Sequence, residues 1–325
     1  MQNLSFLYCF DENYNTQAFV AINSLLENID EKININIIHR NPSSFHIEER
    51  KIANNEKVSK LKITKFATTD HHFPKLKNAH VSEATYYRIF AENYIEEDVD
   101  FLVYLDADIV CLNNPLPLLY ETINKMKSEM KPIAARTEGS RTNYDDWTSQ
   151  QAEAFFKRLD LEGENYFNAG VLVMNFKMWR KENSQKNLLN VMKKYKENII
   201  YWDQDLLNKT FDNNFLEMDS GLNFNLGIHD NVNYSYEYVE KNISFLHFSG
   251  KGKPWNLESI HYRNSNFYQK AYRKISSKKY HIVSNSKIRN SSFLIKNLFN
   301  LRVLEYEYPL EFLLRGLSSL ITFKK

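Results

Sequence analysis

The sequence predicts an α/β fold in which a mainly parallel central sheet is flanked by helices. Short apolar runs alternate with segments of helical periodicity through the first hundred residues, an order typical of strand, helix and strand units with right-handed crossovers. The run over residues 101–105 is wholly apolar, as are parallel strands covered on both faces. With 325 residues, 43% of them hydrophobic and 14% aromatic, the chain can also form the large core that such a fold needs.

The first half of the chain begins with a strand, a polar loop and a helix. Residues 4–10 are expected to form the strand, and residues 11–16 the loop, whose polar side chains are typical of helix starts. The helix that follows carries five apolar residues on one side, namely Phe19, Ile22, Leu25, Leu26 and Ile29. The remaining elements are a strand over 33–39, a helical stretch over 42–60, a strand over 63–66, a helix over 82–94 capped by Ser82, and the strand over 101–105.

The second half continues this pattern without a linker or an internal repeat. Its predicted elements are strands over 133–136, 166–176 and 243–248 and helices over 188–195 and 202–211. We therefore expect one domain over residues 1–260, followed by a basic, aromatic-rich helical segment over residues 261–325.

Two carboxylates stand one residue apart where the apolar run 101–105 ends. In an extended chain Asp106 and Asp108 share a face, and Ala107 is too small to obstruct a ligand between them. Ligands of open α/β sheets bind beyond the carboxyl ends of the strands, and two carboxylates so close repel unless a cation neutralises them. Hard oxygen ligands suit Mg²⁺ or Mn²⁺ that also holds substrate phosphates. A polar exit from strand to loop, with Asp as turn former, is the alternative.

Other sites are less well supported by the sequence. With only 8 Gly there is no glycine-rich phosphate loop, so a bound phosphate must rely on metal, Lys or Arg. Cys9 and Cys111 each lie in an apolar stretch, which predicts buried reduced thiols and not a disulfide or zinc site. The adjacent His71 and His72 are expected in a solvated loop, because no third metal ligand is evident nearby.

The charge of the chain is unevenly distributed. Residues 261–325 hold 13 Lys and Arg against 3 Glu, so this segment carries a formal charge of +10 and the rest of the chain −8. Residues 309–325 place apolar side chains at helical spacing, which is typical of an interfacial amphipathic helix on an anionic membrane. These side chains are Leu310, Leu313, Leu314, Leu317, Leu320 and Ile321. A helix docked on the domain's own surface is the alternative, but the acid-free run before it favours the membrane.

The sequence also predicts where the protein resides. No run approaches the ~18 apolar residues of a membrane-spanning helix, and the N-terminus lacks both a basic head and a long apolar centre. We therefore expect a cytoplasmic protein, held peripherally on the inner face of the cytoplasmic membrane.

Four segments, in their order and spacing, make the chain similar to glycosyltransferase family 8. They are Leu-Asp-Ala-Asp at 105–108, Tyr-Phe-Asn-Ala-Gly-Val at 166–171, Trp-Asp-Gln-Asp at 202–205, and His-Phe-Ser-Gly-Lys-Gly-Lys-Pro-Trp at 247–255. The resemblance runs from Ser5 to about Trp255 and is close to bacterial lipopolysaccharide α-galactosyl- and α-glucosyltransferases, whose basic C-terminal tails attach to the inner membrane. It implies the GT-A type fold of nucleotide-diphosphosugar transferases. It also implies retaining transfer from UDP-galactose or UDP-glucose to a saccharide or glycolipid acceptor, without a nucleic-acid partner.

The resemblance assigns a divalent cation to Asp106, Asp108 and His247, and the imidazole favours Mn²⁺ over Mg²⁺. Lys253, in a loop that begins with Gly250, would hold the diphosphate and offset its charge as UDP leaves. The other donor contacts that it implies are the Cys9 backbone, Asp11 and Asn13 at the uracil and ribose, Ala107 between the carboxylates, and Arg88 near the diphosphate. From the residues alone, Asp11 and Asn13 could equally cap a helix, and Arg88 could be a surface helix residue.

Three residues match those that hold the donor sugar near its reacting carbon. Asn168 is one, Asp203 would accept hydrogen bonds from sugar hydroxyls, and Gln204 would lie on the face opposite the departing UDP. An amide is a poor nucleophile, so front-side reaction of the acceptor is favoured over attack by Gln204, and no pair of glycosidase carboxylates is required. Glu138 stands where close relatives have Asp. The segments 70–82 and 137–160 are expected to set acceptor choice.

Two other functions, from different classes of protein, are alternatives to the glycosyltransferase. Asp106-Ala107-Asp108 at a strand end also fits the nucleophile motif of haloacid dehalogenase phosphatases, but that family carries the motif on its first strand and does not account for the segment ending in Trp255. A sugar-nucleotide binding protein without catalysis is the other.

Overall fold

The computed structural model describes residues 4–67, 73, 82–143, 147–226, 228 and 233–321. Its centre is a seven-stranded sheet in the order β3-β2-β1-β4-β7-β6-β8. The strands are β1 (Ser5–Phe10), β2 (Ile33–His39), β3 (Val58–Lys65), β4 (Phe101–Leu105), β6 (Ile133–Ser140), β7 (Asn165–Asn175) and β8 (Phe215–Glu217). Only β7 runs against the others, since it pairs antiparallel with both β4 and β6. The predicted mainly parallel sheet is confirmed.

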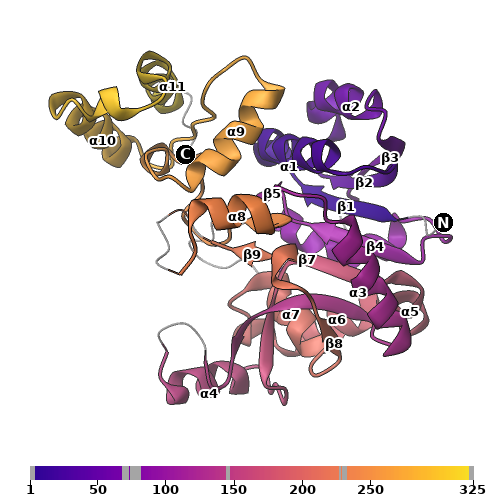
Figure 1. Ribbon diagram of the computed structural model, residues 1–325. Helices are drawn as coiled ribbons and strands as arrows, with labels where there is room; N and C mark the ends of the chain where they lie inside the picture. The colour runs from indigo at the N-terminus through magenta and orange to yellow at the C-terminus, as the bar shows by residue number, and fades with distance from the viewer. Residues whose placement is uncertain are drawn as a thin grey trace.

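Helices cover both faces of this sheet, as predicted (Figure 1). One face packs against α1 (Asn15–Asn28), α2 (His46–Ala53) and α3 (Leu116–Ser128), and the other against the 3₁₀ helix η3 (Glu83–Asn93), α5 (Phe176–Lys181), α6 (Ser184–Lys194) and α7 (Trp202–Thr210). β1 illustrates the alternation: Phe6, Tyr8 and Phe10 face the first layer, whereas Leu7 and Cys9 face the second. Burial on both faces explains why the central strands are continuous apolar runs.

A small second sheet positions part of the site. It has the order β5-β10-β9, with β5 (Ile109–Cys111) antiparallel and β9 (Phe224–Asn225) parallel to β10 (Phe245–His247). The short elements around the two sheets are η1 (Glu12–Tyr14), η2 (Pro42–Phe45), α4 (Ser149–Lys157), η4 (Lys196–Asn198), η5 (Ser220–Leu222), α8 (Tyr236–Asn242) and η6 (Leu257–Ser259).

The elements differ from the sequence prediction in their boundaries, in the type of one helix and in several short elements. The helical stretch predicted over 42–60 ends at Ala53, and β3 begins at Val58, because this edge strand carries Ser59, Lys60 and Lys62 in place of a clear apolar alternation. The predicted helix over 82–94 is the 3₁₀ helix η3, capped by Ser82 as expected through the Ala84 amide. The sequence patterns did not predict β5, β8, β9, α3, α4, α5 or α8.

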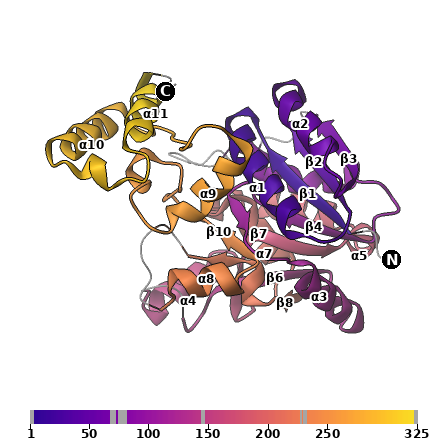
Figure 2. The ribbon, with the colours of Figure 1, turned by 45° about the horizontal axis from the view of Figure 1, so that its top comes forward.

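The C-terminal residues fold into helices that pack in two different places. α9 (Ser265–Ile275) lies against α1 and buries Phe267, Tyr268 and Tyr272 in a cluster with Trp255. α10 (Lys287–Phe299), η7 (Arg302–Glu305) and α11 (Pro309–Ile321) share a separate apolar cluster and stand at one side of the molecule, away from the central sheet (Figure 2). The boundary near residue 260 stays a prediction. In the described part of the chain, no helix combines the length and apolarity needed to cross a membrane.

Candidate functional site

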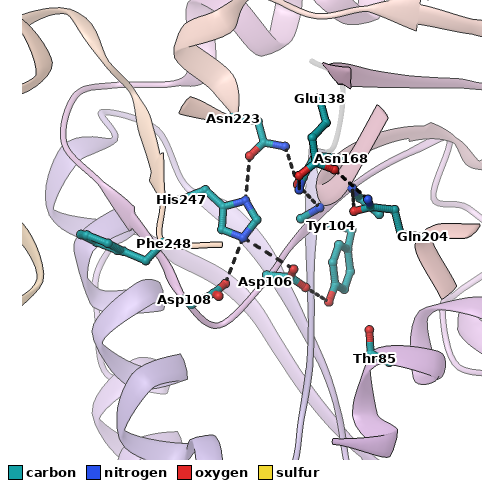
Figure 3. A network of polar contacts seen from close by, with 12 residues as sticks. Thr85, Tyr104, Asp106, Asp108, Glu138, Asn168, Gln204, Asn223, His247 and Phe248 are labelled. Atoms are coloured by element: carbon teal, nitrogen blue, oxygen red, sulfur yellow. Dashed lines mark hydrogen bonds and ion pairs between the residues drawn. The ribbon is translucent and has the colours of Figure 1, made fainter. Parts of the chain in front are cut away.

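The predicted cation ligands converge where the two sheets meet. Asp106 and Asp108 lie in the turn between β4 and β5, and His247 ends β10, whose pairing with β5 places it opposite Ile109. His247 Nε2 lies 3.3 Å from Asp108 Oδ1 and 3.9 Å from Asp106 Oδ2 (Figure 3). One ligand atom from each of the three residues lies within 4.8 Å of the others, close enough to share one ion.

The chemistry of this cluster fits a divalent cation. Asp108 Oδ1 is buried and accepts no hydrogen bond from any described residue, which is costly for a carboxylate oxygen unless another positive group satisfies it. Two carboxylates and one imidazole form a mixed oxygen and nitrogen donor set of the kind that Mn²⁺ accepts, and Mg²⁺ less readily. Asp106, Asp108 and His247 are therefore the residues that would hold the ion.

Two further residues fix the orientation of the His247 ring. Its Nδ1 lies 2.9 Å from the amide oxygen of Asn223, whose own nitrogen donates to Asn168 Oδ1 at 3.0 Å. Because an amide oxygen only accepts, Nδ1 carries a proton, and Nε2 is the ring nitrogen that faces the carboxylates and would bind the cation. Gly170 lies against the same ring, since an added Cβ would meet His247 Cε1 at 2.2 Å.

Lys253 completes the charge balance at Asp108. Its Nζ donates to Asp108 Oδ2 at 2.5 Å and to the Phe248 carbonyl at 2.7 Å. Burial alone would raise the pKa of the Asp108 carboxyl, but Lys253 and His247 beside it hold that pKa well below its usual range. Asp108 is therefore ionised at neutral pH, with a cationic amine at the same crevice.

A second network joins two of the residues predicted at the donor sugar, Asn168 and Gln204, to Glu138. Gln204 Nε2 donates to Glu138 Oε2 at 2.8 Å, and Asn168 Nδ2 lies 3.4 Å from Glu138 Oε1 (Figure 3). The oxygen of Gln204 accepts from the Ala169 amide at 3.0 Å. Glu138 lies within β6, Asn168 within β7 and Gln204 in the first turn of α7, so three elements bring these side chains together.

Arg88 links the cation cluster to Asp203. Its side chain is buried and not at the surface; Nη2 lies 2.9 Å from Asp106 Oδ1, and Nε lies 2.8 Å from Asp203 Oδ2. Its Nη1 also donates to the Ala169 carbonyl at 2.5 Å. The alternative of a surface helix residue is therefore wrong.

Asp203 is a buried carboxylate in the first turn of α7, where the helix N-terminus favours negative charge. Thr85 Oγ1 donates to its Oδ1 at 2.5 Å. Burial raises the pKa of Asp203 to about 6, although the guanidinium of Arg88 and the Thr85 hydroxyl act in the opposite direction. Asp203 thus changes charge close to the physiological pH range.

An open cleft lies in front of the two carboxylates, with an empty volume of about 540 Å³ that includes its open mouth. It is lined by Cys9, Phe10, Tyr14, Ser82, Ala84, Thr85, Tyr104, Asp106, Ala107, Asp108 and Lys253. The lining comes from β1, η3, the β4–β5 turn and the loop after β10, at the carboxyl ends of parallel strands, as expected for an open α/β sheet.

The remaining predicted residues are placed as follows. Asp11 Oδ1 accepts from the Asn13 amide at 2.9 Å and so caps η1, the local role that the sequence also allowed. Neither residue is among those that line the cleft, and their contacts with a donor stay predictions. Gly250 has a φ of 75°, which favours glycine in the loop that carries Lys253. Trp255 is buried against Tyr14 and Tyr268, so it packs this loop down.

Parts of the predicted acceptor loops fall outside the described residues. Of the segment 70–82 only Phe73 and Ser82 are described, so His71 and His72 and their expected solvated loop lie outside. The segment 137–160 is described except for residues 144–146 and contains the end of β6 and α4.

Several site residues were not predicted from the sequence. Asn223 precedes the two-residue strand β9 and has no motif around it. Tyr104 donates its hydroxyl hydrogen to Asp106 Oδ1 at 2.5 Å, but the sequence pattern predicts only that it lies in a strand. Gly170 did have a usable signal, because a glycine inside an apolar strand often marks the close approach of another group.

Comparison with known proteins identifies the family. The sequence model of Glycosyl transferase family 8 matches residues 5–259. A lipopolysaccharide 1,2-glucosyltransferase of Escherichia coli is 27% identical over 284 residues, which cover 81% of this chain and 76% of the relative. A lipopolysaccharide 1,3-galactosyltransferase of Salmonella typhimurium is 28% identical over 176 residues, or 53% of this chain and 49% of the relative.

The fold is also similar to solved structures. A crystal structure of the galactosyltransferase LgtC with donor and acceptor sugar analogs superposes with a TM-score of 0.64 at 22% identity, and the match covers 83% of this chain and 95% of that one. A family match over most of the chain, together with this fold, establishes that the protein belongs to glycosyltransferase family 8.

Proposed function

We propose that this glycosyltransferase is retaining and moves galactose or glucose from UDP-galactose or UDP-glucose to a hydroxyl of a saccharide or glycolipid acceptor. The observation that supports this most is that a cation-binding cluster, a lysine amine held against it and a network of groups able to bind hydroxyls lie side by side, linked through Asn223. These are Asp106, Asp108 and His247; Lys253; and Glu138, Asn168 and Gln204. A surface glycan such as lipopolysaccharide is the proposed acceptor, by analogy with the relatives' names.

The two halves of the crevice have different tasks. A divalent cation, which we propose is Mn²⁺, would act there as a Lewis acid on the departing diphosphate. Lys253, 2.5 Å from Asp108, adds a second positive charge that offsets the charge growing on UDP. Asp108 stays ionised and so continues to hold the ion as the negative charge on the leaving group rises.

The contacts of Gln204 favour front-side reaction. Both ends of its amide are already hydrogen-bonded, the nitrogen to Glu138 and the oxygen to the Ala169 backbone. An amide held in this way is oriented to contact the sugar, but it remains a poor nucleophile. We therefore propose that the acceptor hydroxyl attacks on the face from which UDP leaves, that the leaving phosphate takes its proton, and that Asp203 accepts hydrogen bonds from sugar hydroxyls.

The phosphatase alternative is disfavoured by the acidic residues downstream. Such an enzyme needs further carboxylates beside the metal, yet Asp203 is paired with Arg88, and Asp205 is paired with Arg158. Asp205 also accepts from the Tyr166 hydroxyl at 2.6 Å, which gives it a structural role within α7 and β7.

The test is release of UDP from a panel of UDP-sugars by the purified full chain, with and without Mn²⁺. We expect metal-dependent release from UDP-galactose or UDP-glucose, loss of that release with Asp108→Asn, and unchanged release with Asp98→Asn as an exposed control. Hydrolysis of a generic phosphomonoester without any UDP release would favour the phosphatase instead. Sugar-dependent UDP-sugar binding without turnover would favour the non-catalytic binding protein.

We further propose that the C-terminal helices hold the enzyme on the inner face of the cytoplasmic membrane. α11 buries Phe312, Gly316 and Ser319 against the protein, packs Leu313 and Leu320 partly against the same cluster, and exposes four other apolar side chains to solvent. The exposed fractions are 77% for Leu310, 62% for Leu314, 54% for Leu317 and 82% for Ile321. An apolar stripe facing outward, next to basic residues, favours a bilayer surface over docking on the domain itself.

Vesicle sedimentation tests this attachment. Leu314→Gln combined with Leu317→Gln should weaken binding to phosphatidylglycerol-containing vesicles by about tenfold or more, since each buried leucine contributes roughly 1.5–3 kcal/mol. Ile47→Gln changes a side chain that is 56% exposed on the distant helix α2 and is the matched control. Equal vesicle binding by all three proteins would contradict the proposal.

A further inference from the structure

A second cavity lies outside the catalytic cleft, between the segment that follows η6 and the pair formed by α10 and η7. Its empty volume is about 950 Å³, including its open mouth. None of its lining residues lines the cleft at Asp106 and Asp108. The cavity belongs to the part of the chain beyond residue 259, where the family match ends.

Three polar side chains in this cavity have no partner within the described part of the chain. They are Asn266, which is half-buried, and Arg302 and Glu305, which are exposed to solvent; none of these side chains forms a hydrogen bond or ion pair there. They offer an amide with donor and acceptor groups, a guanidinium with donors only, and a carboxylate with acceptors only. This mixture is complementary to hydroxyl groups, each of which both donates and accepts.

The remaining wall is aromatic. Tyr280, Phe293 and Tyr306 line the same cavity, and Tyr280 and Tyr306 are held by contacts with Phe312 of α11 at ring-centroid distances of 6.2 and 3.9 Å. Packed rings give a rigid apolar surface, and a sugar ring has both an apolar C–H face and a rim of hydroxyls. Apolar walls with a few convergent polar groups are the usual composition of a ligand site.

The charges argue against a phosphate as the ligand. The lining contains the carboxylates of Glu305 and Glu307 against the one guanidinium of Arg302. Glu307 lies 3.3 Å from Arg273, which leaves Glu305 and Arg302 as a balanced pair at the cavity. A dianion would meet a carboxylate without an excess of positive charge, so an uncharged, hydroxyl-rich ligand fits better.

We propose that this cavity is a second saccharide-binding site, which holds a sugar unit of the acceptor glycan at a distance from the reacting hydroxyl. The proposal rests on the proposed transferase function for its link to the acceptor. Leu304 on η7 and Leu301, which directly precedes η7, are exposed beside Arg302 and Glu305, so the site would lie beside the membrane-facing surface, where a glycolipid presents its sugars.

The test is binding of the labelled full chain to an array of bacterial surface saccharides, with EDTA present so that the catalytic cleft lacks metal. We expect wild-type protein to retain at least one saccharide, and Arg302→Ala and Asn266→Ala each to weaken its retention by about fivefold or more, as loss of a hydrogen bond to a bound ligand does. Lys296→Ala removes a charge from an exposed site on α10 outside the lining and should bind as wild type does.

Retention of no saccharide by the wild-type chain would overturn the proposal, as would equal retention by the two cavity variants. UDP release, measured in parallel, separates this result from a failure of the transferase function. Cavity-dependent binding without UDP release would leave the second site standing and contradict the transferase. UDP release, together with saccharide binding that the cavity substitutions leave unchanged, would support the transferase and contradict the second site.

Discussion

Gly170→Ala offers a direct test of the cation site, because one methyl group should disable it. The added Cβ would lie 2.2 Å from His247 Cε1, 2.7 Å from Nδ1 and 2.9 Å from Nε2. Non-bonded carbon atoms sit at about 3.5 Å or more, so the imidazole must move by roughly 1.3 Å. The ring is held by the hydrogen bond between its Nδ1 and Asn223, and a shift of this size would break or lengthen that bond.

A shift of this size is large compared with the tolerance of a coordination bond, which is about 0.2 Å. We expect Gly170→Ala to lose most of its Mn²⁺ affinity and to lower metal-dependent UDP release by about 100-fold, the usual effect of a 1 Å misplacement in a site. The cost in folding free energy should be only about 1–3 kcal/mol, as for other overpacked cores. The variant should therefore stay folded while its site fails.

Calorimetric titration with Mn²⁺ measures the first effect without relying on any assigned reaction, and a thermal melt measures the second. His247→Ala supplies the control, because it removes the ring that the new methyl group would strike. In that background Gly170→Ala should change Mn²⁺ affinity very little, which a double-mutant cycle reports as strong coupling. If the single Gly170→Ala variant bound Mn²⁺ as tightly as the wild type, the steric argument for the cation site would be wrong.

Three further predictions concern other residues of the site. Asn223→Ala should weaken Mn²⁺ binding in calorimetry by about 10-fold, because His247 loses the acceptor that fixes its tautomer, whereas the exposed neighbour Asn225→Ala should have no effect. Since burial raises the pKa of Asp203 to about 6, this carboxylate gains a proton as pH falls through that value; kcat/KM for UDP-sugar hydrolysis should fall with it, and a pH profile of Asp203→Asn should lack this acidic limb. Lys253→Ala should lower kcat for UDP release by about 100-fold in steady-state assays, and an undiminished kcat would exclude it from charge stabilisation.

The strand that delivers the cation ligands could be predicted because its chemistry is local. The run 101–105 is buried on both faces, so it is wholly apolar, and the carboxylates follow directly. The ends of β3 could not be predicted in the same way. An edge strand tolerates lysines, so its alternation of apolar and polar residues is not visible in the sequence.

The contacts around His247 are not local in sequence and so left no pattern. Asn223 is 24 residues from His247, and only the pairing of β9 with β10 brings them together. For α11 the sequence predicted an amphipathic helix but not which side faces outward. That depends on Gly316, whose missing side chain lets the helix approach Leu294 and Leu257, so that Leu313 and Leu320 pack inward while Leu310, Leu314 and Leu317 face outward.

The burial of Arg88 has a consequence for how a donor would enter the cleft. A free arginine side chain gives up about 2 kcal/mol of rotamer entropy when it is immobilised. Here Asp106, Asp203 and the Ala169 carbonyl immobilise the guanidinium when the chain folds, before any nucleotide arrives. The ordering cost therefore falls on the stability of the protein and not on the affinity for any donor that Arg88 contacts.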